Sequence, residues 1–129
     1  MRKAIMLLLA VPLLAFGQEA YIRDVTLDTN GVGAVTFDVR GVLDSIYLSG
    51  VTTANVAIAY SPRGGLADVT IATNVTAQTD VFRPVRQSTG ANNAAVSGSY
   101  GKYVLAGETV TVTFGGVSNA AWRVVLKRE

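Results

Sequence analysis

The sequence predicts an all-β protein: a single antiparallel β-sandwich or jelly-roll-like domain of about 8–9 strands that follows an N-terminal signal peptide. Valine and threonine are abundant after residue 17, and such β-branched residues pack well on pleated strands. Apolar and polar residues alternate with a period of two in short runs, and turn-forming residues separate these runs. Residues 18–129 show no sustained helical periodicity.

The first residues have the composition of a secretory signal. Arg2 and Lys3 form a short positive start, and residues 4–16 (AIMLLLAVPLLAF) form an apolar run. Small residues at Ala15 and Gly17 lie three and one before the expected cleavage point. The apolar run is shorter than the roughly 20 residues that a helix needs to cross a bilayer. The alternatives are a buried N-terminal helix and an uncleaved anchor.

We therefore divide the chain into a signal peptide, residues 1–17, and a β-sandwich domain, residues 18–129. Removing Arg2 and Lys3 leaves 9 basic side chains, which equals the 9 acidic ones. A balanced domain lacks the concentrated basic face that nucleic acids or anionic membranes require. We predict no nucleic-acid partner and no stable membrane span after signal removal. The chain has no cysteine, so an exported domain must be stabilised by its core, by oligomerisation or by both.

Nine runs are expected to form strands, and their alternation predicts which side chains point inward. Trp122 alternates with Val124 and Leu126 and is expected in the core, with a sugar-stacking platform as the alternative. In the third run, Leu43 is expected to share a face with Ser45 and Tyr47. The opposite face is expected to hold Val42, Asp44, Ile46 and Leu48. The nine runs are residues 21–27, 33–40, 42–48, 55–60, 67–72, 78–83, 102–105, 109–114 and 121–127.

Residues 86–101 (RQSTGANNAAVSGSYG) are small, polar and glycine-rich, and they form the longest predicted loop. Loops of this length often carry function. Arg83 and Arg86 flank Pro84 and could bind a carboxylate across a protein interface, where arginine is enriched; the alternative is a pair of solvated side chains. The candidate interaction residues are Arg83, Arg86, Tyr100 and Lys102.

The composition argues against most catalytic chemistry. Without His or Cys, the chain lacks the usual nucleophile–base pairs and the usual zinc, copper and iron ligands. The nine acidic residues are scattered among strands and turns rather than paired as glycosidases require. Asp28 and Asn30 could offer oxygens to calcium, but their spacing is that of a common turn. We predict no enzyme activity, no catalytic residue, no cofactor and no metal site.

Residues 41–129 carry a recognisable order of strand and turn segments. The segments are GVLDSIYL (41–48), NVAIAY (55–60), ADVTI (67–71), TNVTA (73–77), DVFRPVR (80–86), TGA (89–91) and VLAGETVTV (104–112). In this order the chain resembles small β-sandwich virion structural proteins, of the head-decoration type, from tailed bacteriophages and prophages. The resemblance implies a structural role through protein–protein contacts and supplies no catalytic residue. Phage proteins that assemble in the cytoplasm normally lack a secretory signal, and this chain departs from that pattern.

Two functional hypotheses follow. The first is a non-enzymatic structural protein of a phage or prophage virion, similar to a capsid decoration protein. It would form a homo-oligomer or join the virion lattice through its Thr-rich strand faces and residues 86–101. The second is an exported bacterial surface or periplasmic β-sandwich domain that binds glycan or an envelope protein. The expected location is accordingly the periplasm, cell surface or extracellular space, or the virion.

Overall fold

The computed structural model describes residues 19–62, 64–89 and 94–129, and this part of the chain is all-β with antiparallel pairing. The predicted signal peptide lies outside the described residues. Counting the three runs of β2 separately gives about nine strands, so the predicted fold class is confirmed. The strands are β1 Glu19–Thr26, β2 Val32–Ser61, β3 Val69–Phe82, β4 Val85–Thr89, β5 Ala95–Lys102, β6 Val104–Gly116 and β7 Ala121–Arg128.

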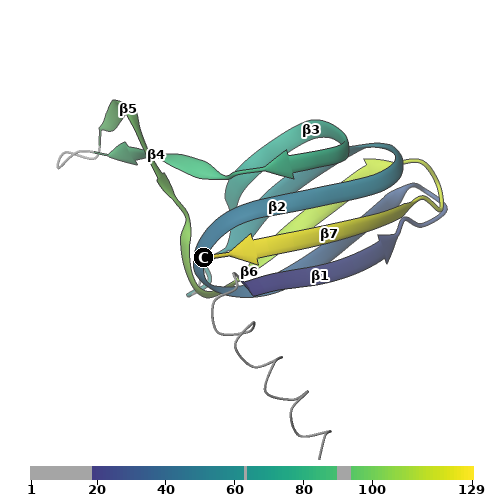
Figure 1. Ribbon diagram of the computed structural model, residues 1–129, viewed down its shortest axis with the longest axis horizontal. Coiled ribbons are helices and arrows are strands. Elements are labelled where there is room, and N and C mark those ends of the chain that lie inside the picture. Colours follow the sequence, from purple (N-terminus) through teal and green to yellow (C-terminus); the bar gives the residue numbers. More distant parts are fainter. Residues whose placement is uncertain (1–18, 63, 90–93) are drawn as a thin grey trace, which may run out of the picture.

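One hydrogen-bonded sheet folds over on itself to form two layers (Figure 1). The first layer has the order β1, β7, β2 and β3, with β2 contributing residues 43–50. In the second layer β6 lies between residues 32–42 and residues 54–61 of β2, and β3 pairs with the latter run. Strands β2 and β3 therefore each take part in both layers and join them.

A β-bulge in β2 changes which of its side chains point inward. Leu43 pairs with Arg128 and Ser45 with Lys127, so β2 has one extra residue, Asp44, at this step. An extra residue reverses the in–out alternation that follows it. Inward positions consequently have odd numbers up to Leu43 and even numbers from Ile46 onward.

The core fills the space between the two layers with aliphatic and aromatic side chains. Ring contacts help to define it: Phe114 lies 4.9 Å from Trp122, and Tyr21 meets Phe37 edge-on at 6.5 Å between ring centroids. Close packing of this kind contributes the hydrophobic stabilisation that a cysteine-free domain needs. The largest fully buried side chains are Phe37, Phe114, Leu27, Leu43, Ile46, Leu48, Ile58, Leu126, Val39, Val56, Val110 and Val112.

Trp122 is 2% exposed, which confirms the prediction that it is a core residue. Gly50 pairs with Trp122 on the neighbouring strand. A Cβ atom added to Gly50 would lie only 2.4 Å from Cε2 of the indole ring. The ring therefore packs against the backbone of β2, a contact that only glycine permits at this position.

Several sequence predictions differ from the structure. The runs predicted at 67–72 and 78–83 both lie largely in β3, and the run predicted at 102–105 spans the end of β5 and the start of β6. The runs at 33–40, 42–48 and 55–60 are parts of one strand, because β2 bends through bulges instead of ending at turns. The predicted loop at 86–101 instead contains β4 and most of β5. The face assignment of residues 42–48 was wrong for Leu43, because the bulge places it inward with Ile46 and Leu48.

The packing of Trp122 on Gly50 yields a stability prediction. We expect Gly50→Ala to lower the free energy of unfolding by about 1–3 kcal/mol, because the new methyl group overpacks the core. Gly115→Ala is the matched control, since an added Cβ there meets nothing within 4 Å. Urea unfolding followed by tryptophan fluorescence measures both variants. Equal stabilities for Gly50→Ala and the wild-type protein would contradict the proposed packing.

Candidate functional site

The strands β4 and β5 form a hairpin that projects from one end of the sandwich (Figure 1). They pair only with each other among the described residues. We call residues 85–102 the hairpin arm. An isolated two-stranded hairpin is at best marginally stable in water, so contacts with other surfaces are expected to stabilise this one.

One face of the hairpin arm carries two exposed apolar side chains. Val85 pairs with Lys102 and Gln87 pairs with Tyr100, and residues that pair directly share a face of an antiparallel ladder. Val85 is 53% exposed and Tyr100 is 61% exposed. Arg86 lies on the opposite face. The first face thus carries Val85 and Tyr100 beside the polar side chains of Lys102 and Gln87, with Val85 at the root of the arm and Tyr100 farther out.

Buried residues anchor both ends of the hairpin arm to the sandwich. Pro84 precedes β4 and Tyr103 follows β5, and both are buried. The backbone amide of Leu43 donates a 2.8 Å hydrogen bond to the carbonyl oxygen of Tyr103. The Tyr103 ring also meets Tyr60 at 5.8 Å between centroids. The root of the arm is therefore part of the packed body.

An ion-pair network surrounds this root. The Lys102 ammonium lies 3.0 Å from Oδ1 of Asp44 and also binds the Glu129 carboxylate. Nη1 of Arg83 lies 4.0 Å from Oδ2 of Asp44. The hydrogen bond from Lys102 lowers the pKa of Asp44 below its ordinary value, while Glu129 and Asp44 together raise the pKa of Lys102. Asp44 is the bulged residue of β2, so the bulge also places the carboxylate that holds the arm.

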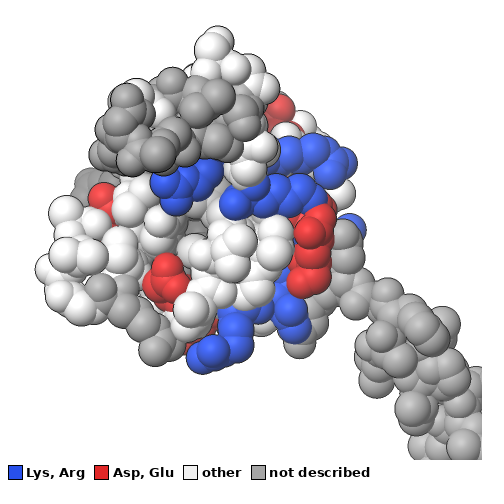
Figure 2. Space-filling view, turned by 90° about the vertical axis from the view of Figure 1, so that its left-hand side faces the viewer, with Lys and Arg blue, Asp and Glu red and all other residues white. Residues whose placement is uncertain are grey.

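The structure brings two of the four predicted interaction residues together. Arg83 and Lys102 both contact Asp44, whereas Arg86 and Tyr100 lie farther out on the exposed hairpin arm. Basic and acidic side chains adjoin on the right-hand side of the body in Figure 2. The Arg83 side chain stays 68% exposed despite its contact with Asp44, so a carboxylate of a partner remains a prediction for it.

Sequence reasoning missed Asp44 and Glu129 as parts of this site. Asp44 lies far from Lys102 in the sequence, and no local pattern links the two. One signal was present, because Asp44 was the single charged residue on a predicted strand face that it shared with Ile46 and Leu48. A lone carboxylate among inward positions indicates a bulge, a buried partner or both.

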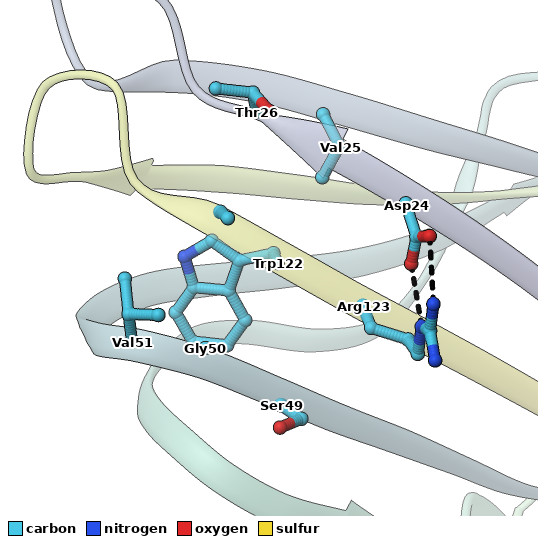
Figure 3. Close-up of a pocket in the computed structure, with 9 residues that line it drawn as sticks. Asp24, Val25, Thr26, Ser49, Gly50, Val51, Trp122 and Arg123 are labelled. Carbon is cyan, nitrogen blue, oxygen red and sulfur yellow. Dashed lines mark hydrogen bonds and ion pairs between the residues drawn. The ribbon is translucent and has the colours of Figure 1, made fainter.

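A shallow hollow of about 390 Å³ is lined by residues of β1, β2 and β7 in the first layer. Asp24 and Arg123 form a two-point ion pair at its edge, with N–O distances of 2.7 and 3.0 Å (Figure 3). The hydrogen bonds from Arg123 lower the pKa of the Asp24 carboxyl. The lining residues are Asp24, Val25, Thr26, Ser49, Gly50, Val51, Ala121, Trp122 and Arg123.

Trp122 contributes little accessible surface to this hollow, because its ring packs inward against Gly50 and Phe114. Its indole nitrogen is buried without a hydrogen-bond partner among the described residues. A sugar ring can stack only on an exposed aromatic face. The alternative interpretation of Trp122 as a sugar-stacking platform is therefore wrong.

The described residues contain no group of three or more His, Cys, Asp or Glu side chains that could hold a metal ion. Oδ1 of Asp28 accepts hydrogen bonds from the backbone amides of Asn30 and Val32 at 2.8 and 2.9 Å. The Asp28 side chain therefore stabilises the turn in which Gly31 has a φ of 75°. In this part of the chain no helix has both the length and the apolar character needed to span a bilayer.

Comparison of the chain with protein-family models, with curated proteins and with solved structures gave no match. The features that bear on function are consequently the hairpin arm, its ion-pair network and the outer surfaces of the two layers.

The lowered pKa of Asp44 predicts how attachment of the arm depends on pH. A carboxyl group with a lowered folded-state pKa stabilises the folded form at pH values above its ordinary pKa of 3.8, and this contribution is lost as the pH falls through the lowered value. The Leu43 amide donates its hydrogen bond to Tyr103. Below about pH 4 we expect this amide to exchange faster than the pH dependence of its intrinsic exchange rate accounts for. Hydrogen exchange monitored by NMR from about pH 6 to about pH 2.5 measures this change.

Lys102→Met is the control, because it keeps the aliphatic stem and removes the charge. In this variant the local pH dependence should be largely absent, since Asp44 loses its main hydrogen-bond donor. An unchanged acid transition at Leu43 in Lys102→Met would contradict the assignment.

Proposed function

We propose that this protein is a non-enzymatic structural component of a phage or prophage virion, similar to a capsid decoration protein, which acts through protein–protein contacts. The projecting hairpin arm is the observation that carries this proposal. It extends beyond the core, exposes Val85 and Tyr100 on one face, and is held at its root by Asp44. An arm of this kind is suited to reach a neighbouring subunit while its own body stays folded.

The rest of the molecule supports this role. A two-layer sandwich joined by β2 and β3 offers a rigid base for the arm. Main-chain hydrogen bonds between strands are the same for any partner sequence. The exposed side chains of the arm would therefore provide specificity for one partner. Repetition of weak contacts over a symmetric lattice gives strong attachment without a large individual interface. The resemblance of residues 41–129 to head-decoration-like proteins gives the virion as the setting.

Fractionation of phage particles tests the proposal. Particles induced from the source strain are purified on a density gradient and probed for this protein. We expect stoichiometric amounts in the particles and a loss of roughly tenfold or more for the double variant Val85→Asp, Tyr100→Asp, because buried unpaired carboxylates disfavour an apolar contact. Detection of the protein only in envelope or secreted fractions would contradict the virion role.

Val117→Asp is the matched control for these substitutions. Val117 is also about half exposed but lies in the turn between β6 and β7, away from the hairpin arm. This variant should join particles as the wild-type protein does. Circular dichroism of each variant verifies that the fold is retained, so that a loss from particles can be assigned to the arm.

The hollow beside Asp24 and Arg123 favours a second candidate function, an exported domain that binds glycan or an envelope protein. Its volume falls within the range of ligand pockets, and a charged pair at the rim could orient polar groups. A glycan array distinguishes the two functions. Binding that is lost in Arg123→Ala and kept in Arg86→Ala would support the second candidate, whereas an absence of binding to any glycan would contradict its glycan form.

A further inference from the structure

A row of apolar side chains crosses the outer face of the first layer from one edge to the other. Ile22 on β1 pairs with Val125 on β7, Val125 pairs with Tyr47 on β2, and Tyr47 pairs with Val81 on β3. We call these four residues the outer stripe. Ile22 is 55% exposed and Val81 is 47% exposed.

The outer stripe lies on the side of the sheet that faces away from the core. Tyr47, for example, lies between the buried residues Ile46 and Leu48, which point inward. Directly paired residues share a face, so all four stripe residues point outward. A half-solvated antiparallel sheet normally presents polar residues on this side, and an unbroken apolar row is typical of an interaction surface.

We propose that the outer stripe is the contact by which two copies of this chain pair, related by a twofold axis that runs parallel to the strands. Such an axis keeps each row of residues in register and exchanges the two edges of the layer. Ile22 of one copy then faces Val81 of the second copy, and Val125 faces Tyr47. Ile22 and Val81 are similar in size, and Val125 is a small residue that packs against the larger Tyr47. The twofold symmetry makes each of these contacts occur twice.

The polar row next to the stripe is also self-complementary under this rotation. Its order across the layer is Asp24, Arg123, Ser49 and Thr79. The exchange brings Thr79 of the second copy opposite Asp24, where its hydroxyl can donate to the carboxylate. It likewise brings Ser49 opposite Arg123, whose guanidinium donates to the hydroxyl oxygen. No charge of like sign is placed directly opposite another in this row.

Lys127 on the other side of the stripe provides charge complementarity. Its ammonium lies 4.7 Å from the centre of the Tyr47 ring, and no described carboxylate lies within ion-pair distance of it. The same rotation turns Lys127 towards the bulge of the second copy, where the Asp44 carboxylate already binds Lys102. On pairing, Lys127 would thus join an existing ion-pair network of the second copy, a charge complementarity that an unrelated apolar partner would lack.

The small size of the face indicates a weak contact. Four strands span only about 20 Å at an interstrand spacing of roughly 4.8 Å. Stable complexes bury about 800 Å² on each partner, so this pairing is expected at high local concentration, as on a lattice. The inference goes beyond the proposed function and involves a surface distinct from the hairpin arm.

Opposed charges at Ile22 and Val81 test both the surface and the axis. Ile22→Lys and Val81→Glu should each weaken self-association by roughly tenfold or more, because a charge then meets an apolar side chain. An equimolar mixture of the two variants should associate again. In the mixed pair the introduced ammonium of one chain faces the introduced carboxylate of the other, while the symmetry-related contact keeps its native valine and isoleucine. Sedimentation velocity over a concentration series measures all three samples.

Val32→Lys is the matched control, because Val32 is similarly exposed but lies at the start of β2 outside the outer stripe. The control and the arm variant Val85→Asp, Tyr100→Asp should self-associate as the wild-type protein does. A loss of self-association through the outer stripe can therefore be distinguished from a loss of incorporation into virions through the hairpin arm. A wild-type protein that stays monomeric at millimolar concentration, or a variant mixture that stays monomeric, would overturn the inference.

Discussion

The bulge at Leu43–Ser45 is the feature on which the rest of the structure depends. Strand β2 passes through both layers, and each layer needs its apolar side chains to point into the same core. The buried apolar residues of β2 have odd numbers up to Leu43 and even numbers from Ile46 onward, so strict alternation would turn one of these sets toward solvent. The extra residue Asp44 reverses the alternation at the crossing, so Phe37 and Ile58 are buried on one continuous strand.

The same bulge links the fold to the hairpin arm. Asp44 is released from the regular ladder and accepts the Lys102 ammonium, while the neighbouring Leu43 amide binds the carbonyl oxygen of Tyr103. One irregularity therefore completes the core and fixes the direction in which the arm leaves the body. Beyond this root the strands of the arm pair only with each other among the described residues, so its outer part can engage another surface.

Regular alternation explains which parts of the fold could be predicted from the sequence. The inward positions Val110, Val112 and Phe114 were correct because a ladder without a bulge preserves the period of two. The face of Leu43 was wrong because strict alternation was assumed through the bulge, whose one local sign is the carboxylate of Asp44 on a face with Ile46 and Leu48. Residues 86–101 were predicted to be a loop because strands outside the core need few apolar residues, and small polar residues with glycine resemble a loop.

The candidate site was predicted in part for similar physical reasons. Arg83 was singled out because it flanks Pro84 together with Arg86, which is a signal local to the sequence. The acceptor that Arg83 shares with Lys102, Asp44, comes from a distant strand, and only the folded topology brings it close. The outer stripe was also invisible in the sequence, because its four residues come from four different strands and align only through their register.

Native-state hydrogen exchange is the most direct test of a rigid sandwich that carries a separately stabilised arm. We expect amides of β2 in both layers to exchange together with the highest protection, because this strand takes part in both layers. Amides of β4 and β5 should exchange much faster in the isolated protein and become protected in assembled particles. Equal protection of arm and core in the isolated protein, or an unprotected arm in the assembly, would contradict this division of the molecule.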